Sequence, residues 1–82
     1  PEERVVQDVI DTGIMPHLLK LLTKGVTYLE IPALRVLGNI MTGDDNQTQL
    51  AFDLGFLPHL VRLMTSSSQE TRRRTAWVVS NL

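Results

Sequence analysis

The sequence predicts an all-α fold in which two three-helix repeats stack into a right-handed superhelical solenoid. One observation is internal similarity: shifted by 42 residues, the chain lays residues 11–18 over residues 53–60, and Asp, Gly, Pro, His and Leu recur. Five further identities keep this register: Gln7 and Gln49, Leu21 and Leu63, Thr23 and Thr65, Val36 and Val78, and Asn39 and Asn81. The second observation is that apolar residues follow helical spacing in both halves. A fixed period of this kind is the signature of repeat proteins.

The length of the period indicates the type of repeat. A period of 42 residues is too long for tetratricopeptide or ankyrin units and falls in the range of about 40 to 47 residues for HEAT and armadillo repeats. Three helices per unit, with Gly-x-x-Pro between the first two, favour the armadillo type over the two-helix HEAT type. The predicted armadillo repeats are residues 1–42 and 43–82, and truncation of the last helix is left open.

Glycine and proline divide each repeat into helices. Gly13 and Gly55 stand where the first helix turns sharply into the second, a place for a positive φ or a close backbone approach. Pro16 and Pro58 follow in the opening turn of the second helix, where a missing N–H costs little. The predicted helices are residues 2–12, 14–24, 28–42, 45–54, 56–66 and 69–82.

Two other helices carry a start signal of their own. Pro32 suits the first turn of the third helix. Asp44 or Asp45, after Gly43, can cap the first helix of the second repeat by accepting bonds from its free N–H groups.

Apolar stripes mark the expected core. We expect the stripe on the second helix of each repeat to pack against a stripe on the third. The second-helix residues are Leu18, Leu21, Leu22, Leu60, Leu63 and Met64, and the third-helix residues are Leu34, Leu37, Met41, Ala76, Val79 and Leu82. Because each unit covers its apolar faces only by stacking on neighbours, two uncapped repeats imply further chain or self-association through the uncovered ends.

Composition narrows the class of function. The 82 residues are 43% hydrophobic and carry a net charge of −1, which gives no overall attraction to nucleic acid or to an anionic membrane. We therefore expect neither of these as a partner. The absence of cysteine excludes disulfides, thiolate metal sites and a cysteine nucleophile. The chain begins without methionine and shows no secretory or transmembrane leader, which suggests a fragment.

No pattern for catalysis is found in the sequence. A phosphate-binding glycine loop, a serine elbow and a ligand-spaced histidine pair are all absent, so we expect no enzyme activity, cofactor or metal. His17 and His59 recur without nearby ligating partners and are expected at the surface or in a turn. The arginines at 72–74 are interpreted as a solvated helix face, although Arg73 lies one turn before Trp77 and can stack on it.

A polar stripe on the third helices is the candidate binding surface. Arg35, Asn39 and Thr42 fall at i, i+4 and i+7, and Trp77 and Asn81 occupy the equivalent stripe. Because third helices line the concave face of a solenoid, the two asparagines become successive rungs of a groove. An amide can pair with both N–H and C=O of an extended peptide, and an indole can flank a lysine stem and attract its ammonium.

Each of these residues also has a structural interpretation. Tryptophan is often buried, and composition alone rates a core position for Trp77 equal to a groove position. Its alignment with Arg35, which rarely sits unpaired in a core, favours the groove. The asparagines can bond neighbouring repeats as readily as a peptide, and the two roles can coexist.

Two stretches of the sequence resemble the importin-alpha (karyopherin-alpha) family. Residues 32–49, PALRVLGNIMTGDDNQTQ, are similar to its stretch of the form PALR-x-x-GNI-x-TG-x-D-x-QTQ, and residues 76–81, AWVVSN, contain its WxxSN signature. In that family, tryptophan and asparagine arrays bind nuclear-localisation signals at two sites, with arginine-bearing repeats between them. The order of Arg35 and then Trp77 therefore implies repeats from the middle to late part of the array.

The resemblance also implies a function and a set of site residues. It implies a non-enzymatic nuclear import adaptor in cytoplasm and nucleus, with lysine- and arginine-rich signal peptides of cargo as partners and importin-beta bound through a segment absent here. The implied peptide-binding residues are Arg35 and Asn39 in the linking region, and Thr42, Asp45, Thr48, Trp77 and Asn81 at the minor site. The alternatives are a general armadillo scaffold with other partners and a nucleic-acid-binding helical repeat.

Overall fold

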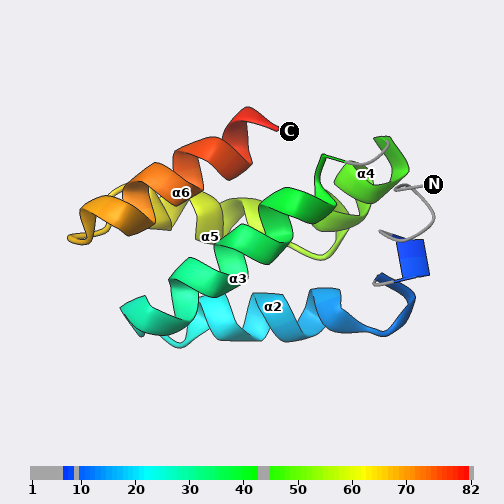
Figure 1. Cartoon of the computed structure of the whole chain (residues 1–82), viewed down its shortest axis with the longest axis horizontal. Helices are drawn as coiled ribbons and strands as arrows, with labels where there is room; N and C mark the ends of the chain where they lie inside the picture. The colour runs from blue at the N-terminus through cyan, green and yellow to red at the C-terminus, as the bar shows by residue number, and fades with distance from the viewer. Residues whose placement is uncertain (1–6, 9, 43–44, 82) are drawn as a thin grey trace.

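The computed structural model describes residues 7–8, 10–42 and 45–81, and within these ranges every regular element is a helix (Figure 1). The helices are α2 (Ile14–Thr23), α3 (Thr27–Ile40), α4 (Asp45–Asp53), α5 (Phe56–Leu63) and α6 (Gln69–Ser80). Residues 7, 8, 10 and 11 are also helical, in agreement with a first helix before Gly13. The all-α prediction is confirmed, and the helices end earlier than predicted because their last turns loosen into the connections.

The turns between first and second helices require glycine for its backbone conformation. Gly13 and Gly55 have φ of 82° and 87°, and each is the residue before α2 or α5. No atom lies within 4 Å of a Cβ built at either position, so the positive φ and not a close approach explains the residue. The sequence had left these two reasons open.

Two predictions about helix starts need correction or lie outside the described residues. Pro32 is inside α3 and not in its first turn, because the helix already begins at Thr27 after the extended Val26. Gly43 and Asp44 lie outside the described residues, and Asp45 is the first residue of α4, where its charge favours the helix dipole. A cap that the sequence analysis did not single out is Ser68, whose Oγ accepts a bond from the Thr71 N–H at 3.2 Å.

The second repeat stacks on the first through its second and third helices. In Figure 1, α3 and α6 lie side by side, and α5 also packs against α2. Within each repeat the second helix packs against the third, as α2 against α3 and α5 against α6. The core between them contains Ile10, Met15, Leu18, Leu22, Ala33, Leu34, Leu37, Ile40, Met41, Ala51, Phe56, Leu60, Leu63 and Val78.

The predicted apolar stripe is buried in the first repeat, with Leu21 half-buried at its edge, and is wrong in part for the second. Ala76 and Met64 are exposed, Val79 is half-buried, and Leu82 lies outside the described residues. The buried residues of α6 are Thr71, Thr75 and Val78. Thr75 can be buried because its Oγ1 donates to the Thr71 carbonyl at 2.7 Å, which leaves its methyl group to pack. The Thr71 Oγ1 atom, in contrast, is buried without a hydrogen-bond partner among the described residues.

Several residues that recur at the 42-residue period make the same hydrogen bond in both repeats. Gln7 Nε2 donates to Asp11 Oδ1 at 2.9 Å, and Gln49 Nε2 donates to Asp53 Oδ1 at 3.0 Å. Thr23 and Thr65 each donate to the carbonyl three residues earlier. The repetition of the sequence is therefore a repetition of local bonding as well as of packing.

Candidate functional site

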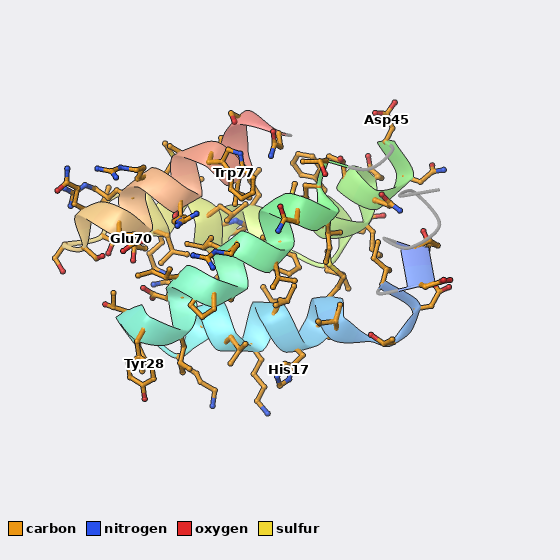
Figure 2. The ribbon with its side chains drawn as sticks, in the orientation of Figure 1. His17, Tyr28, Asp45, Glu70 and Trp77 are labelled. Carbon is orange, nitrogen blue, oxygen red and sulfur yellow. The ribbon has the colours of Figure 1, made fainter. Side chains whose placement is uncertain are left out.

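The candidate site is built on one face that α3 and α6 share, which we call the α3–α6 face and which consists of Arg35, Gly38, Asn39, Trp77 and Asn81. Arg35 and Asn39 are exposed on α3, one turn apart. Trp77, on the neighbouring helix α6, keeps 37% of its surface exposed, and Figure 2 shows its ring between the two helices. The indole is therefore neither a core residue nor a free surface residue: one side is packed and another is open.

The indole ring of Trp77 packs directly against Gly38. A Cβ built at Gly38 would overlap Cζ3 of Trp77 and would lie 2.7 Å from its Cε3 and Cη2 atoms, well inside contact distance. Glycine in a helix interior costs roughly 1 kcal/mol relative to alanine, so its presence there needs a reason. The reason is that only a residue without a side chain lets the ring rest on the α3 backbone. The sequence signal for this was a glycine inside an otherwise regular helix, next to the polar stripe.

The two asparagines make no hydrogen bond through their side chains among the described residues. Asn39 is exposed. Among the described residues, the hydrogen bond that a side chain makes to it goes from Thr42 Oγ1 to its backbone carbonyl, at 2.7 Å, and leaves its own side-chain amide unbonded. Asn81 is half-buried, and its Nδ2 atom is buried without a hydrogen-bond partner. Within the described part of the chain, the alternative that these amides tie the two repeats together therefore finds no supporting bond.

Three other predicted site residues lie beyond the end of α3. Thr42 is exposed and bonded to its own helix end, Asp45 is exposed at the start of α4, and Thr48 is half-buried one turn further on. Figure 2 shows Asp45 well apart from Trp77. Arg35 and Asn39 lie one turn apart on α3, Trp77 and Asn81 lie one turn apart at the end of α6, and the packing of Trp77 on Gly38 joins the two helices. Asp45, at the start of α4, lies apart from Trp77.

A hollow that the sequence analysis did not identify adjoins the indole. It has a volume of about 290 Å³ and is lined by Glu70, Arg73, Arg74 and Trp77. Glu70 and Arg74, one turn apart, form an ion pair of 3.5 Å whose side chains are 53% and 33% exposed, and a pair that reaches solvent in this way contributes little to stability. Arg73 and Trp77 line the same hollow, which is compatible with the stacking predicted for them. The i, i+4 spacing of Glu70 and Arg74 was the available sequence signal.

The remaining candidates from the sequence lie outside this face. His17 is exposed, and Figure 2 shows it on the far side of α2 from Trp77. His59 is half-buried. In the described ranges no cluster of three metal-ligating side chains is found, and no helix described there is long and apolar enough to cross a membrane.

Comparison with known proteins identifies the repeat and its relatives. A family model described as Armadillo/beta-catenin-like repeat matches residues 44–82. Importin subunit alpha-1a of Oryza sativa subsp. japonica is 42% identical over 78 residues, which is 94% of this chain and 15% of the relative. Importin subunit alpha-3 of Arabidopsis thaliana is 51% identical over 45 residues, covering 55% of this chain and 8% of the relative. The chain thus spans only a small part of the length of these relatives.

Solved structures agree with the fold. A designed armadillo repeat protein in complex with the peptide (KR)4 superimposes with a TM-score of 0.89 at 29% identity, over 93% of this chain and 32% of its own. An engineered protein superimposes with a TM-score of 0.91 at 27% identity, over 95% of this chain and 32% of its own. The fold, the matched family model and the identity to the importin subunits lead to one conclusion: this chain belongs to the importin-alpha family of armadillo-repeat proteins.

Proposed function

We propose that this chain forms part of a nuclear import adaptor and binds lysine- and arginine-rich nuclear-localisation peptides in extended conformation along the α3–α6 face. The observation that carries the proposal is the half-exposed indole of Trp77, seated on Gly38 beside exposed Asn39. An indole ring can bind the long basic side chains of an extended peptide, and a neighbouring amide can bind the peptide backbone.

Each group on the face has a distinct part in this proposal. The open side of the Trp77 ring packs against the methylene stem of a peptide lysine and attracts its ammonium. The amide of Asn39, which is exposed and bonds nothing else in the described chain, pairs with peptide N–H and C=O groups and sets the register. Asn81 can take part only through its Oδ1 atom as an acceptor, because its Nδ2 atom is buried. Asp45, exposed beyond the end of α3, meets a further basic side chain, with Thr42 and Thr48 beside it.

The relatives support this chemistry. The designed armadillo protein that shares the fold was solved with a peptide of alternating lysine and arginine, and the curated relatives are importin alpha subunits. Because the chain spans 15% of the rice relative, the rest of the adaptor activity, including binding of importin-beta and passage between cytoplasm and nucleus, belongs to the proposal and not to this chain's own geometry.

One observation favours the alternative of a scaffold for other partners. Arg73 and Arg74 line the hollow beside Trp77, and only Glu70 opposes their charge there. A peptide with acidic residues would find two guanidiniums in reach, whereas a lysine placed in this hollow would be repelled. Under the import proposal, the lysine stem therefore lies on the Asn39 side of the ring and not in the hollow.

Calorimetric titration of the chain with the (KR)4 peptide tests the import proposal. We expect binding, and we expect Trp77→Ala to weaken it by ~2- to 30-fold, the loss of about 0.5 to 2 kcal/mol of contact between an aromatic ring and a cation. Tyr28→Ala is the matched control, because Tyr28 is also aromatic, is 75% exposed and lies away from the α3–α6 face (Figure 2).

The alternatives give different results in the same titration. Equal affinity of the wild type and Trp77→Ala for (KR)4 would reject the import proposal. A glutamate-rich peptide that binds more tightly than (KR)4, and that loses affinity in Arg73→Ala, would support the scaffold alternative. Binding of single-stranded RNA with a steep salt dependence would support a nucleic-acid function instead.

A further inference from the structure

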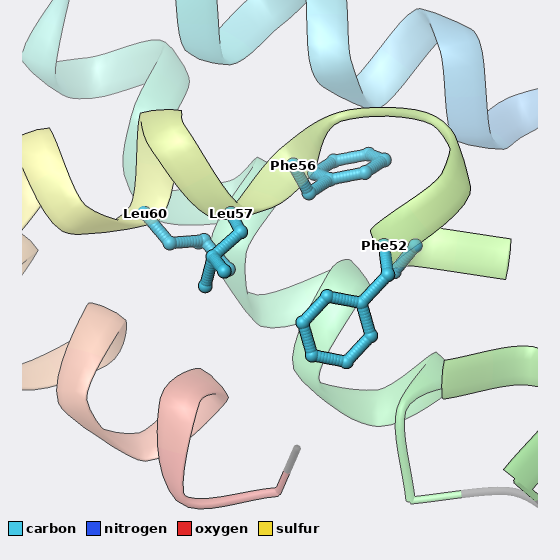
Figure 3. A pocket seen from close by; sticks show the side chains of 5 residues that line it. Phe52, Phe56, Leu57 and Leu60 are labelled. Carbon is cyan, nitrogen blue, oxygen red and sulfur yellow. The ribbon is translucent and has the colours of Figure 1, made fainter. Parts of the chain in front are cut away.

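The hollow beside Trp77 is charged, in contrast to a hollow between α4 and α5. Figure 3 shows the latter, which is lined by the apolar residues Ala51, Phe52, Phe56, Leu57 and Leu60. The hollow beside Trp77 is lined by one acidic and two basic residues as well as the indole. Its volume of about 290 Å³ is roughly ten times the ~30 Å³ that one water molecule takes up in the liquid, so it has room for a side chain.

The charged hollow lies on the side of α6 that faces the first repeat. The four residues that line it are spaced at i, i+3, i+4 and i+7 and therefore form one stripe along the helix. They are Glu70, Arg73, Arg74 and Trp77. Trp77 rests on Gly38 of α3, and Figure 2 shows Glu70 on the same side of α6. The hollow thus belongs to the junction between two described helices, next to the proposed peptide path.

Among the described residues, one guanidinium of the hollow has no partner. Glu70 pairs with Arg74 at 3.5 Å, so the hollow already accepts one carboxylate. Arg73 is exposed and makes no hydrogen bond or ion pair within the described ranges. Two guanidiniums against one carboxylate leave an excess of one positive charge. A further carboxylate would neutralise this charge, and a guanidinium can bind it through two parallel N–H groups.

The unpaired guanidinium is within reach of a peptide whose lysine packs on Trp77. Arg73 precedes Trp77 by four residues, which is about 6 Å along the helix axis. In an extended peptide, side chains i and i+2 lie on the same side and are about 6.6 Å apart. The side chain two residues from the lysine therefore matches the separation of Trp77 and Arg73, and a carboxylate at that position can meet the guanidinium.

We propose that this hollow is a carboxylate-binding subsite, which takes the side chain of a glutamate or aspartate close to the lysine that packs on Trp77. The inference rests on the proposed function, because the peptide must first bind along the α3–α6 face. The preferred peptide then carries a basic run with an acidic residue beside it. Overall attraction does not produce such a preference, since the chain has a net charge of −1 and does not attract an added negative charge.

Calorimetric titration with two matched peptides tests this subsite. One peptide is AEAKRKRKAEA, in which a glutamate lies two residues outside the basic run at either end, and the other is AQAKRKRKAQA. We expect the glutamate peptide to bind ~2- to 5-fold more tightly, which is the range of a solvent-exposed ion pair. We also expect the preference to shrink as the salt concentration rises, because salt screens exposed charges.

Three variants assign the preference to the hollow. Arg73→Gln removes the unpaired guanidinium and is expected to abolish the preference for glutamate. Arg72→Gln is the matched control, because Arg72 donates to the Ser66 carbonyl and does not line the hollow. We expect it to leave the ratio of the two affinities unchanged. Glu70→Gln frees Arg74 from its ion pair and is expected to increase the preference by ~2-fold or more.

The outcomes separate this inference from the proposed function. If both peptides bind equally well and Trp77→Ala weakens both, the subsite is overturned and the proposed function stands. If neither peptide binds, both are overturned. A preference for glutamate that persists in Arg73→Gln, or that Arg72→Gln loses to the same extent, also overturns the subsite, because the hollow is then not its source.

Discussion

Gly38 and Trp77 show how a single missing side chain can position a binding group. The indole lies against the α3 backbone because nothing projects from Gly38, and the ring is thereby held beside Asn39 with one side open. An aromatic side chain whose rotamer is fixed by packing loses less freedom on binding than a mobile one. Gly38 lowers the stability of α3, and in return the Trp77 ring has a fixed orientation on the α3–α6 face.

Gly38→Ala is expected to move the ring. Helix propensity alone would raise the unfolding free energy by roughly 1 kcal/mol, but the new methyl group would overlap the indole. We expect the fluorescence emission of Trp77, the sole tryptophan, to shift to longer wavelength and (KR)4 affinity to fall. Thr27→Ala, at the exposed start of the same helix, is the control. An unchanged emission spectrum in Gly38→Ala would contradict the proposed seat.

Asn81 allows a structural role to be separated from a binding role. Its Nδ2 atom is buried without a partner among the described residues, so Asn81→Ala removes no hydrogen bond that this atom donates there. We expect the unfolding free energy in urea to change by less than ~0.5 kcal/mol. Under the import proposal, (KR)4 affinity falls by ~2- to 10-fold, since a net hydrogen bond contributes about 0.5 to 1.5 kcal/mol.

The control for this comparison is Asn46→Ala, which changes an exposed asparagine of α4. Should Asn81→Ala lower the unfolding free energy by more than about 1 kcal/mol while leaving peptide affinity intact, the residue acts in the fold and not in binding.

Among the helices, α6 is the one whose stability depends most on its N-cap, Ser68. Its sequence is polar, its buried side chains are two threonines and one valine, and its last residues have no further helix to cover them within the described chain. The Ser68 cap satisfies the Thr71 N–H, one of the amide groups that the first turn leaves unbonded. A helix with little apolar burial gains proportionally more from such a bond.

Ser68→Ala is therefore expected to lower the unfolding free energy by ~1 kcal/mol, the usual contribution of an N-cap serine. Urea denaturation measures it. Ser67→Ala is the neighbouring control, because Ser67 is exposed and makes no hydrogen bond among the described residues. Equal midpoints for the two variants would show that the cap does not limit α6.

Element positions could be predicted from the sequence because glycine, proline and apolar spacing act locally. Gly13 and Gly55 mark both turns with a positive φ, as their residue type allows. The buried face of α6 was not predictable in the same way. Hydrophobicity favoured Ala76 over Thr75, but burial there depends on which side of the helix meets α3, a contact between distant segments.

At the scale of the whole molecule, repetition explains both what the sequence predicts and what it misses. Leu34 and Leu22 are fully buried, whereas their counterparts Ala76 and Met64 are exposed, although the residues have the same place in the period. Position within a repeat fixes which side of a helix a residue occupies. Whether that side is covered depends on the presence of a neighbouring unit, and sequence periodicity contains no such information.

The candidate site was predictable in its parts and not in its arrangement. Exposure of Arg35 and Asn39 followed from the helical spacing of the polar stripe, and the open edge of Trp77 followed from its alignment with Arg35. The hollow with Glu70 and Arg73 depends on how side chains lie in space, and periodicity does not specify that. The peptide-binding roles of these residues remain predictions.

The packing of Trp77 on Gly38 crosses the boundary between two units, because the ring comes from one and its support from the other. Peptide recognition would then depend on the interface between two repeats, and an isolated repeat would contain only half of the binding groups. Replacing one repeat by that of a homologue would change the interface on both sides of it. Ligand preference should therefore be transferred by a pair of adjacent repeats and not by a single repeat.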